Sequence, residues 1–122
     1  MANSVRIKRI YEPKAADDGR RILVDRLWPR GVSKAEAGLD LWLEDVAPST
    51  PLRKWFGHRP DRWQEFQKRY FVELEGSPAL ARLRDIARTG PVTLLYGAKD
   101  EIHNQARALA SFLERESGPA NR

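Results

Sequence analysis

The sequence has 122 residues, a length that fits one folded domain. Hydrophobic residues make up 41% of the chain and charged residues 32%, and this share of apolar residues, with four Trp, four Phe and three Tyr, excludes a disordered chain. The absence of cysteine excludes disulfides, thiolate zinc sites and cysteine nucleophiles. No segment has the apolar core of a signal peptide or approaches the roughly 20 apolar residues of a membrane span. We therefore expect a cytoplasmic protein with no membrane contact.

The net charge of +5 is unevenly distributed along the chain. Residues 1–34 hold nine Lys or Arg residues against four acids, which accounts for the whole excess, whereas residues 35–122 hold thirteen of each. A basic first third is typical of a surface that faces an anion. Lys and Arg on edge strands also protect against aggregation, so the charge alone leaves both interpretations open.

Two strands are expected in this first third. Val5, Ile7 and Ile10 alternate with basic residues as in a half-exposed strand, and residues 22–24 form an apolar run typical of a buried strand. The turn signal at residues 17–19 separates them. Because a parallel crossover normally needs a dozen or more residues, the sequence leaves open whether the two strands are antiparallel or separated in the sheet.

Capping residues and glycines predict helices in the middle of the chain. Ser33 and Glu36 have the spacing of a capping box for a short helix. The alternation over residues 39–46 is too irregular to assign as a strand. Cap and proline starts followed by glycine stops then define three further helices, at residues 49–57, 60–76 and 77–90.

The last part of the chain predicts a strand and a helix. Residues 91–96 form a second buried run, and Asp100 is a suitable N-cap for a final helix. The residues of that helix predicted to face inward are Ile102, Ala106, Leu109 and Leu113.

Charged and polar residues follow both buried strands. Asp25, Arg26, Trp28 and Arg30 come after the first, and Lys99, Asp100, His103 and Asn104 come after the second. Ligands of open α/β sheets bind at the carboxyl ends of the strands, so two parallel neighbouring strands would place both groups on one rim. The free N–H groups at the start of the final helix, residues 100–104, would face that rim and suit a phosphate or a carboxylate.

Each candidate on this rim also has a structural interpretation. Arg26 and Arg30 have the planar donors of a bidentate anion clamp, but either could pair with Asp25 and fix the turn. Trp28 could pack as a plug or present a stacking face. His103, Asp25 and Asp100 are the candidate catalytic groups, of which Asp100 is first a helix cap. With only two histidines in the chain, a histidine-rich metal site is excluded. A mixed site of one histidine with carboxylates stays open, but no ligand spacing indicates one, so we expect neither a metal nor a cofactor.

Three blocks of sequence carry most of these candidates. They are RILVDRLWPRG at residues 21–31, APSTPLRKWFGH at 47–58 and VTLLYGAKDEIHN at 92–104. The blocks resemble the signatures of the bacterial YeaO-like family, the short branch of domain-of-unknown-function family 488, and the match extends over nearly the whole chain. The family pattern more often has alanine at Gly97. The resemblance implies a small cytosolic α/β domain without an established activity, and it adds His58 to the ligand-binding candidates Arg26, Trp28, Arg30, Lys99 and Asn104.

The sequence therefore predicts one α/β domain over residues 1–122, with a short, largely parallel sheet, helices packed over it and a frayed tail from residue 116. The leading functional hypothesis is a pocket at the carboxyl ends of the strands that binds a phosphorylated metabolite, a nucleotide or a small carboxylate; whether it is catalytic stays open. A nucleic-acid-binding module that uses the basic first third and Trp28 is one alternative. A noncatalytic partner-binding domain is another, and the oligomeric state is left open.

Overall fold

The computed structural model describes residues 5–117. Its strands are β1 (Val5–Arg9), β2 (Arg20–Leu23), β3 (Leu41–Trp42) and β4 (Val92–Tyr96). Its α-helices are α1 (Lys34–Ala37), α2 (Thr50–Phe56), α3 (Trp63–Leu74), α4 (Pro78–Thr89) and α5 (Gln105–Ser117), and short 3-10 helices lie at Ala16–Asp18, Glu44–Val46 and Pro60–Arg62. The predicted α/β class is confirmed. The tail predicted to fray at 116–122 lies outside the described residues from 118 on, while 116 and 117 end α5.

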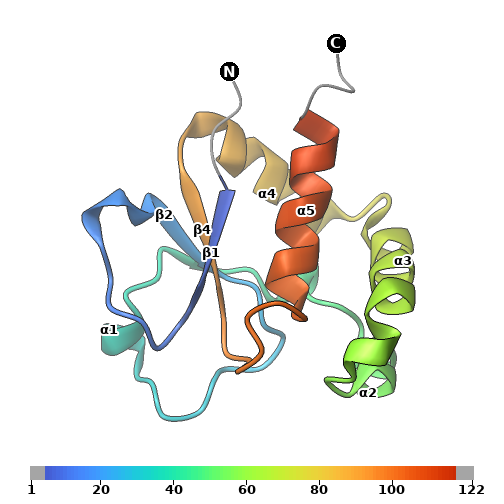
Figure 1. Cartoon of the computed structure of the whole chain (residues 1–122). Coiled ribbons are helices and arrows are strands. Elements are labelled where there is room, and N and C mark those ends of the chain that lie inside the picture. The colour runs from blue at the N-terminus through green and yellow to red at the C-terminus, as the bar shows by residue number, and fades with distance from the viewer. Residues whose placement is uncertain (1–4, 118–122) are drawn as a thin grey trace.

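The four strands form one parallel sheet in the order β1-β4-β2-β3 (Figure 1). Leu94 of β4 lies between Ile7 of β1 and Ile22 of β2. This order answers the question that the sequence left open, because β1 and β2 are parallel and β4 separates them. Their connection over residues 10–19 contains only a 3-10 helix, which is enough to pass one intervening strand.

The central strands are buried on both faces, as expected for a parallel sheet. Ile22 and Leu94 face the larger core, into which α3, α4 and α5 pack. Leu23 and Leu95 point to the opposite face and form a smaller core with Ile10 and with Ala37 of α1. Figure 1 shows this asymmetry, with α1 on one side of the sheet and the longer helices on the other.

Most predicted helices have the expected caps. The Ser49 and Ser77 hydroxyls accept hydrogen bonds from the N–H groups of Leu52 and Leu80, at the starts of α2 and α4. The unassigned segment at residues 39–46 contains the two-residue strand β3 and a 3-10 helix. The helix predicted from residue 60 starts as a 3-10 turn and becomes α3 at Trp63.

The predicted start of the last helix is wrong. Helix α5 begins at Gln105, and the Asn104 side chain caps it by accepting a hydrogen bond from the N–H of Arg107. Asp100 instead accepts from the N–H groups of Ile102 and His103, which closes a separate turn before the helix. Ile102 is consequently 62% exposed and does not face the core.

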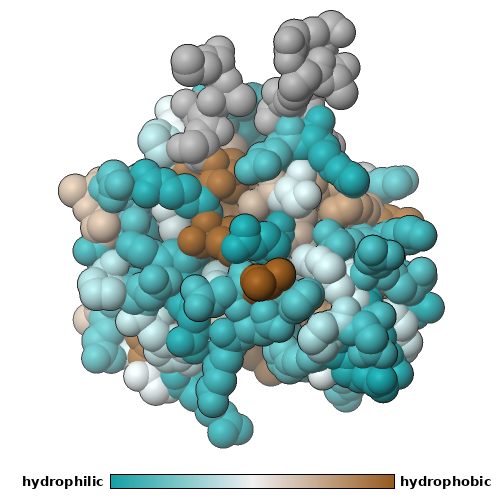
Figure 2. Space-filling view, viewed as in Figure 1, coloured by the Kyte–Doolittle hydropathy of each residue, from teal (hydrophilic) through white to brown (hydrophobic). Residues whose placement is uncertain are grey.

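The surface is largely hydrophilic. The face shown in Figure 2 carries only a few separate apolar side chains. Among the described residues the large hydrophobic side chains that are exposed are Tyr11, Leu27, Val72 and Ile102. None of the helices over residues 5–117 is long and apolar enough to cross a membrane.

Candidate functional site

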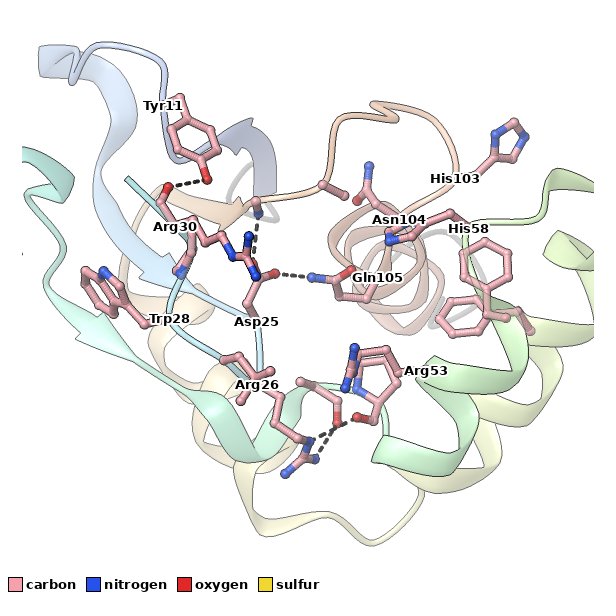
Figure 3. Close-up of a pocket in the computed structure, with 18 residues that line it drawn as sticks. Tyr11, Asp25, Arg26, Trp28, Arg30, Arg53, His58, His103, Asn104 and Gln105 are labelled. Atoms are coloured by element: carbon pink, nitrogen blue, oxygen red, sulfur yellow. Dashed lines mark hydrogen bonds between the residues drawn. The ribbon is translucent and has the colours of Figure 1, made fainter. Parts of the chain in front are cut away.

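A pocket of about 440 Å³ lies at the carboxyl ends of β2 and β4 (Figure 3). It is bordered by the loop after β2, the start of α2, the loop after β4 and the first residue of α5. Its polar lining residues are Tyr11, Asp25, Arg26, Arg30, Arg53, His58, His103, Asn104 and Gln105, and its other lining residues are Leu27, Trp28, Pro29, Ala47, Pro48, Phe56, Phe66, Gly97 and Ala98. We call this the rim pocket.

The rim pocket brings together most of the site residues predicted from sequence. Those that line it are Asp25, Arg26, Trp28, Arg30, His58, His103 and Asn104. Lys99 and Asp100 do not line it: Lys99 is exposed, and Asp100 is held in its own turn. The parallel strands place the two groups on one rim, and His58 joins them from the end of α2.

Asp25 is the acid at the floor of the pocket. Its carboxylate accepts hydrogen bonds from the Gly97 N–H, at 2.9 Å, and from the Gln105 side-chain amide. Burial raises its pKa to about 6, although these two hydrogen bonds oppose the shift. The predicted ion pair with Arg26 or Arg30 is wrong, since no arginine donates to this carboxylate. Asp25 therefore changes charge close to neutral pH.

Gly97 allows the end of β4 to approach this carboxylate. A Cβ atom at this position would lie 3.0 Å from Asp25 Oδ2 and 3.3 Å from Cβ of Pro29. An alanine here would need the neighbouring groups to shift by a few tenths of an ångström. Glycine at position 97, where the family pattern more often has alanine, therefore allows the close contact between the ends of β2 and β4.

Arg26 and Trp28 are held by backbone carbonyls. The Arg26 guanidinium donates to the carbonyl oxygens of Ala47 and Pro48, at 3.1 and 3.2 Å. The indole N–H of Trp28 donates to Val32 O, and its ring packs edge to face on Trp42 at 5.4 Å. Both side chains fix the loop after β2 to its surroundings, so neither is a free anion clamp or stacking face.

Arg30 and Arg53 are the available cations of the rim pocket. Both side chains are exposed, and neither guanidinium makes a hydrogen bond or ion pair with another described residue. Figure 3 shows Arg30 on one side of the pocket and Arg53 on the other. The backbone of Arg30 is fixed because its carbonyl accepts a 2.8 Å hydrogen bond from the Tyr11 hydroxyl. The two guanidinium groups can therefore bind an anion between them.

His58 is exposed and has a left-handed backbone. Its φ of 57° follows the φ of 53° at Gly57, and it is the one non-glycine residue with positive φ among residues 5–117. This conformation is uncommon outside glycine, although histidine tolerates it better than most residues. It carries the chain away from the end of α2 and places His58 beside the pocket.

His103 and Asn104 are engaged by the turn before α5. His103 Nδ1 lies 2.9 Å from Asp100 Oδ2, and its ring packs edge to face on Trp63. The His103 N–H groups that bind Asp100 hold the pKa of that carboxyl at about 2, with help from the N–H of Ile102. The Asn104 amide donates to Asp100 O and is buried. The predicted anion cradle at residues 100–104 is therefore occupied by the chain's own side chains.

The sequence does not identify three polar residues of the pocket as site candidates: Tyr11, Arg53 and Gln105. Arg53 was assigned only to the helix after Ser49, and Gln105 only to the body of the last helix. The basic pair Arg53 and Lys54, in the same sequence block as His58, is the signal that could have indicated Arg53. Nothing in the sequence around Tyr11 indicated that its hydroxyl reaches Arg30.

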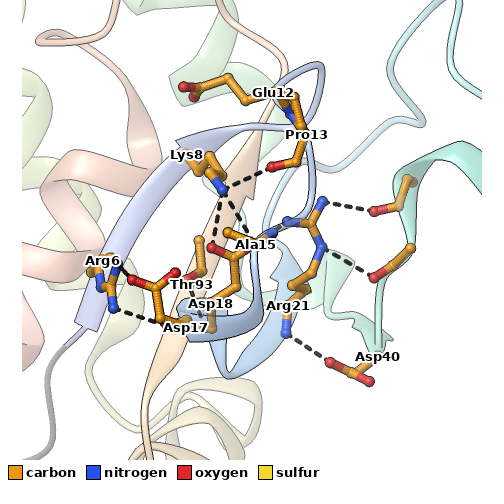
Figure 4. A network of polar contacts seen from close by, with 12 residues as sticks. Arg6, Lys8, Glu12, Pro13, Ala15, Asp17, Asp18, Arg21, Asp40 and Thr93 are labelled. Carbon is orange, nitrogen blue, oxygen red and sulfur yellow. Dashed lines mark hydrogen bonds and ion pairs between the residues drawn. The ribbon is translucent and has the colours of Figure 1, made fainter.

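Three cations of the basic first third pair with acids of the same chain (Figure 4). Arg6 pairs with Asp17, and Lys8 and Arg21 both pair with Asp18. Arg21 is fully buried and also donates to the carbonyls of Ala37 and Gly38. These cations are therefore not a free anionic-ligand surface.

Within the described part of the chain, no group of three His, Asp or Glu side chains is arranged to hold a metal ion. The pocket offers instead a titratable carboxyl, two free guanidinium groups and two imidazoles. This set can bind an anion and exchange a proton with it.

Comparison with known proteins agrees with the three sequence blocks. A family model described as the inactive DUF488-N3 subclade, DUF488-N3i, matches residues 4–121. The protein YeaO of Escherichia coli K12 is 44% identical over 111 residues, which cover 90% of this chain and 96% of YeaO. The protein Rv3073c of Mycobacterium tuberculosis H37Rv is 43% identical over 109 residues, 89% of this chain and 92% of that protein. Both are described as uncharacterized proteins. No solved structure matches. The chain is therefore a YeaO-like member of the DUF488 family.

Proposed function

We propose that this protein binds a small organic anion in the rim pocket and does not chemically transform it. The observation that supports this best is the pair of guanidinium groups, Arg30 and Arg53, which line the same pocket and have no partner among residues 5–117. Arg21 and Arg26, in contrast, donate to backbone carbonyls of the same chain. Two arginines without partners at a concave site are typical of an anion-binding site.

Binding without turnover is favoured by what lines the pocket. Covalent catalysis needs a nucleophile next to a base. None of the described lining residues is Ser, Thr, Cys or Lys, and the Asp25 carboxylate, which could act as a nucleophile, is hydrogen-bonded to Gly97 and Gln105 and not to a base. His103 is oriented by Asp100, but in Figure 3 its ring points away from Asp25. The matching family model is described as an inactive subclade. Together these observations support a binding protein over an enzyme.

Nucleic-acid binding has less support. Its sequence argument depended on the basic first third and on Trp28 as a stacking platform. Arg6, Lys8 and Arg21 pair with acids of the same chain, and Trp28 packs on Trp42. These three cations and the Trp28 ring are therefore already engaged within the fold, and they do not form a free surface for a phosphate backbone.

The test is a titration of ¹⁵N-labelled protein with sodium acetate and with inorganic phosphate, followed by amide chemical shifts. We expect saturable shifts of amides in residues 25–30, 97–98 and 105, and at least a tenfold weaker affinity in the double variant Arg30→Gln/Arg53→Gln (about 1.4 kcal/mol). The control is Lys54→Gln, which removes an exposed cation of α2 that does not line the pocket.

Two results would contradict the proposal. One is the absence of saturable shifts with either anion. The other is binding that Lys54→Gln weakens as much as the double variant does, because the anion would then respond only to overall charge. Shifts confined to β1 would instead favour the nucleic-acid alternative.

A further inference from the structure

We propose that the ligand of the rim pocket is an aryl carboxylate, with its carboxylate between Arg30 and Arg53 and its aromatic body against the apolar wall of the pocket. This inference rests on the anion site proposed above and names the class of molecule that it takes. The evidence is the composition of the pocket wall, the location of exposed apolar side chains and the charge at the pocket floor.

Part of the pocket wall is apolar. Phe56 and Phe66 stack with ring centroids 4.3 Å apart and both line the pocket. Pro29, Ala47 and Pro48 add buried apolar surface on the side of β2. Inorganic phosphate and acetate are too small and polar to cover such a wall. Pockets for larger organic molecules, in contrast, are mostly apolar with a few placed polar groups.

Exposed apolar side chains also gather at the mouth. Leu27 is 65% exposed and Tyr11 is 44% exposed, and both line the pocket. They are two of the four large hydrophobic residues that are exposed among residues 5–117; the other two, Val72 and Ile102, lie elsewhere. A ligand body that covers Leu27 would remove this apolar surface from water.

The charges favour a carboxylate over a phosphate ester. Guanidinium forks bind carboxylates and phosphates alike through two parallel hydrogen bonds, so the acid at the pocket floor makes the difference. Asp25 lies at the floor with no cation paired to it, so a ligand with several negative charges would be repelled there once this acid ionises. A single charge held at the mouth, with a neutral aromatic body toward the floor, avoids that repulsion. The volume of about 440 Å³ is within the range of small-molecule pockets.

The experiment compares five probes by calorimetry or by amide shifts: acetate, inorganic phosphate, phenylacetate, phenylacetamide and phenyl phosphate. We expect phenylacetate to bind at least about tenfold more tightly than acetate, because its ring buries apolar surface, and at least about tenfold more tightly than the neutral amide. Leu27→Ser should weaken phenylacetate about threefold or more while leaving acetate unchanged. Val72→Ser, a matched change of an exposed side chain away from the pocket, should alter neither.

The outcomes separate this inference from the proposed function. If acetate and phosphate bind as tightly as phenylacetate, the anion site stands and the aryl class is wrong. If phenylacetamide binds as tightly as phenylacetate, the pocket is an apolar site and the anion proposal fails. If no probe binds, both proposals fail. If a phosphorylated probe such as phenyl phosphate binds more tightly than phenylacetate, the preference for a carboxylate is overturned.

Discussion

Two carboxylates at opposite ends of β2 have opposite environments. Asp18, just before the strand, binds Lys8, Arg21 and the N–H of Ala15 (Figure 4). Burial alone would raise its pKa, but these donors outweigh burial and lower the pKa to about 2. Asp25, just after the strand, has two neutral donors and no cation, and burial raises its pKa to about 6.

The difference separates a structural charge cluster from a candidate site. At the Asp18 end Lys8 and Arg21 both pair with this acid, which holds the loop before β2 to β1 and α1. At the Asp25 end the acid has no cation and the nearby Arg30 and Arg53 have no acid. Folding thus satisfies charges at one end of the strand and leaves them available at the other, as is common where a protein binds a ligand.

The largest effect is expected at Asp18. Asp18→Asn leaves the fully buried Arg21 without a counter-charge, and breaking a buried pair on one side costs about 3 to 5 kcal/mol. Urea denaturation followed by circular dichroism measures the loss. The matched control is Asp17→Asn, which removes only the exposed partner of Arg6 and should cost at most about 1 kcal/mol. Equal losses in the two variants would show that the buried cluster does not stabilise the fold.

A different response to pH is expected from Asp25→Asn. The folded-state pKa lies above the ordinary value of 3.8, so ionisation of Asp25 opposes folding, and this cost grows as pH rises from about 4 to about 6. The amide removes it and can still bind Gly97 and Gln105 if the Gln105 amide flips. Relative to wild type, the variant should gain about 2 kcal/mol of unfolding free energy between pH 4 and pH 7.

Denaturation at a series of pH values checks this difference. The opposite trend is expected for Asp18, whose stabilising effect is complete above about pH 4 and is lost as pH falls toward about 2. A constant difference between wild type and Asp25→Asn across pH 4 to 7 would contradict the proposed environment of Asp25.

A smaller effect is expected at the cap of α5, which positions Gln105 against Asp25. Asn104→Ala removes the acceptor for the Arg107 N–H and should cost about 1 kcal/mol of stability. It should also lower the affinity for anionic probes, because Gln105 and Asp25 lose their fixed geometry. Thermal melts with and without phenylacetate measure both. Loss of stability with unchanged affinity would separate the cap from the site.

The smallest effect on stability is expected from the free arginines. Arg30→Gln and Arg53→Gln remove exposed charges without partners, so each should change the unfolding free energy by less than about 0.5 kcal/mol. Binding of anions should nevertheless fall. A larger destabilisation, measured by urea denaturation, would mean that these arginines are structural like Arg21.

The sequence predicts the framework of this fold well because its signals are local. The buried runs at 22–24 and 92–96 and the caps at Ser49 and Ser77 act within a few residues. The start of α5 was misassigned because Asp100 and Asn104 are both good cap residues, and only the surrounding packing selects Asn104.

The sequence indicates where the candidate residues lie, but not which contacts they make. Clustered charges after two strands were enough to place Asp25 and Arg30 on one rim. Which arginine side chain is available to a ligand depends on tertiary contacts. Arg26 donates to the carbonyl of Pro48, 22 residues away in the sequence, whereas Arg53 lines the pocket from α2. The sequence also leaves open which cations of the basic first third are paired, because the pairing of Asp18 with Arg21 and Lys8 depends on the strand order.

The most direct test of the contrast between the two ends of β2 is the pH titration of the Asp18 and Asp25 carboxyl carbons by ¹³C NMR. The environments described above predict a pKa of about 2 for Asp18 and about 6 for Asp25. Two pKa values close to the ordinary 3.8, or a pKa of Asp25 below that of Asp18, would contradict this account. Folding would then not pair the carboxylate at one end of β2 with cations while leaving the carboxylate at the other end without them.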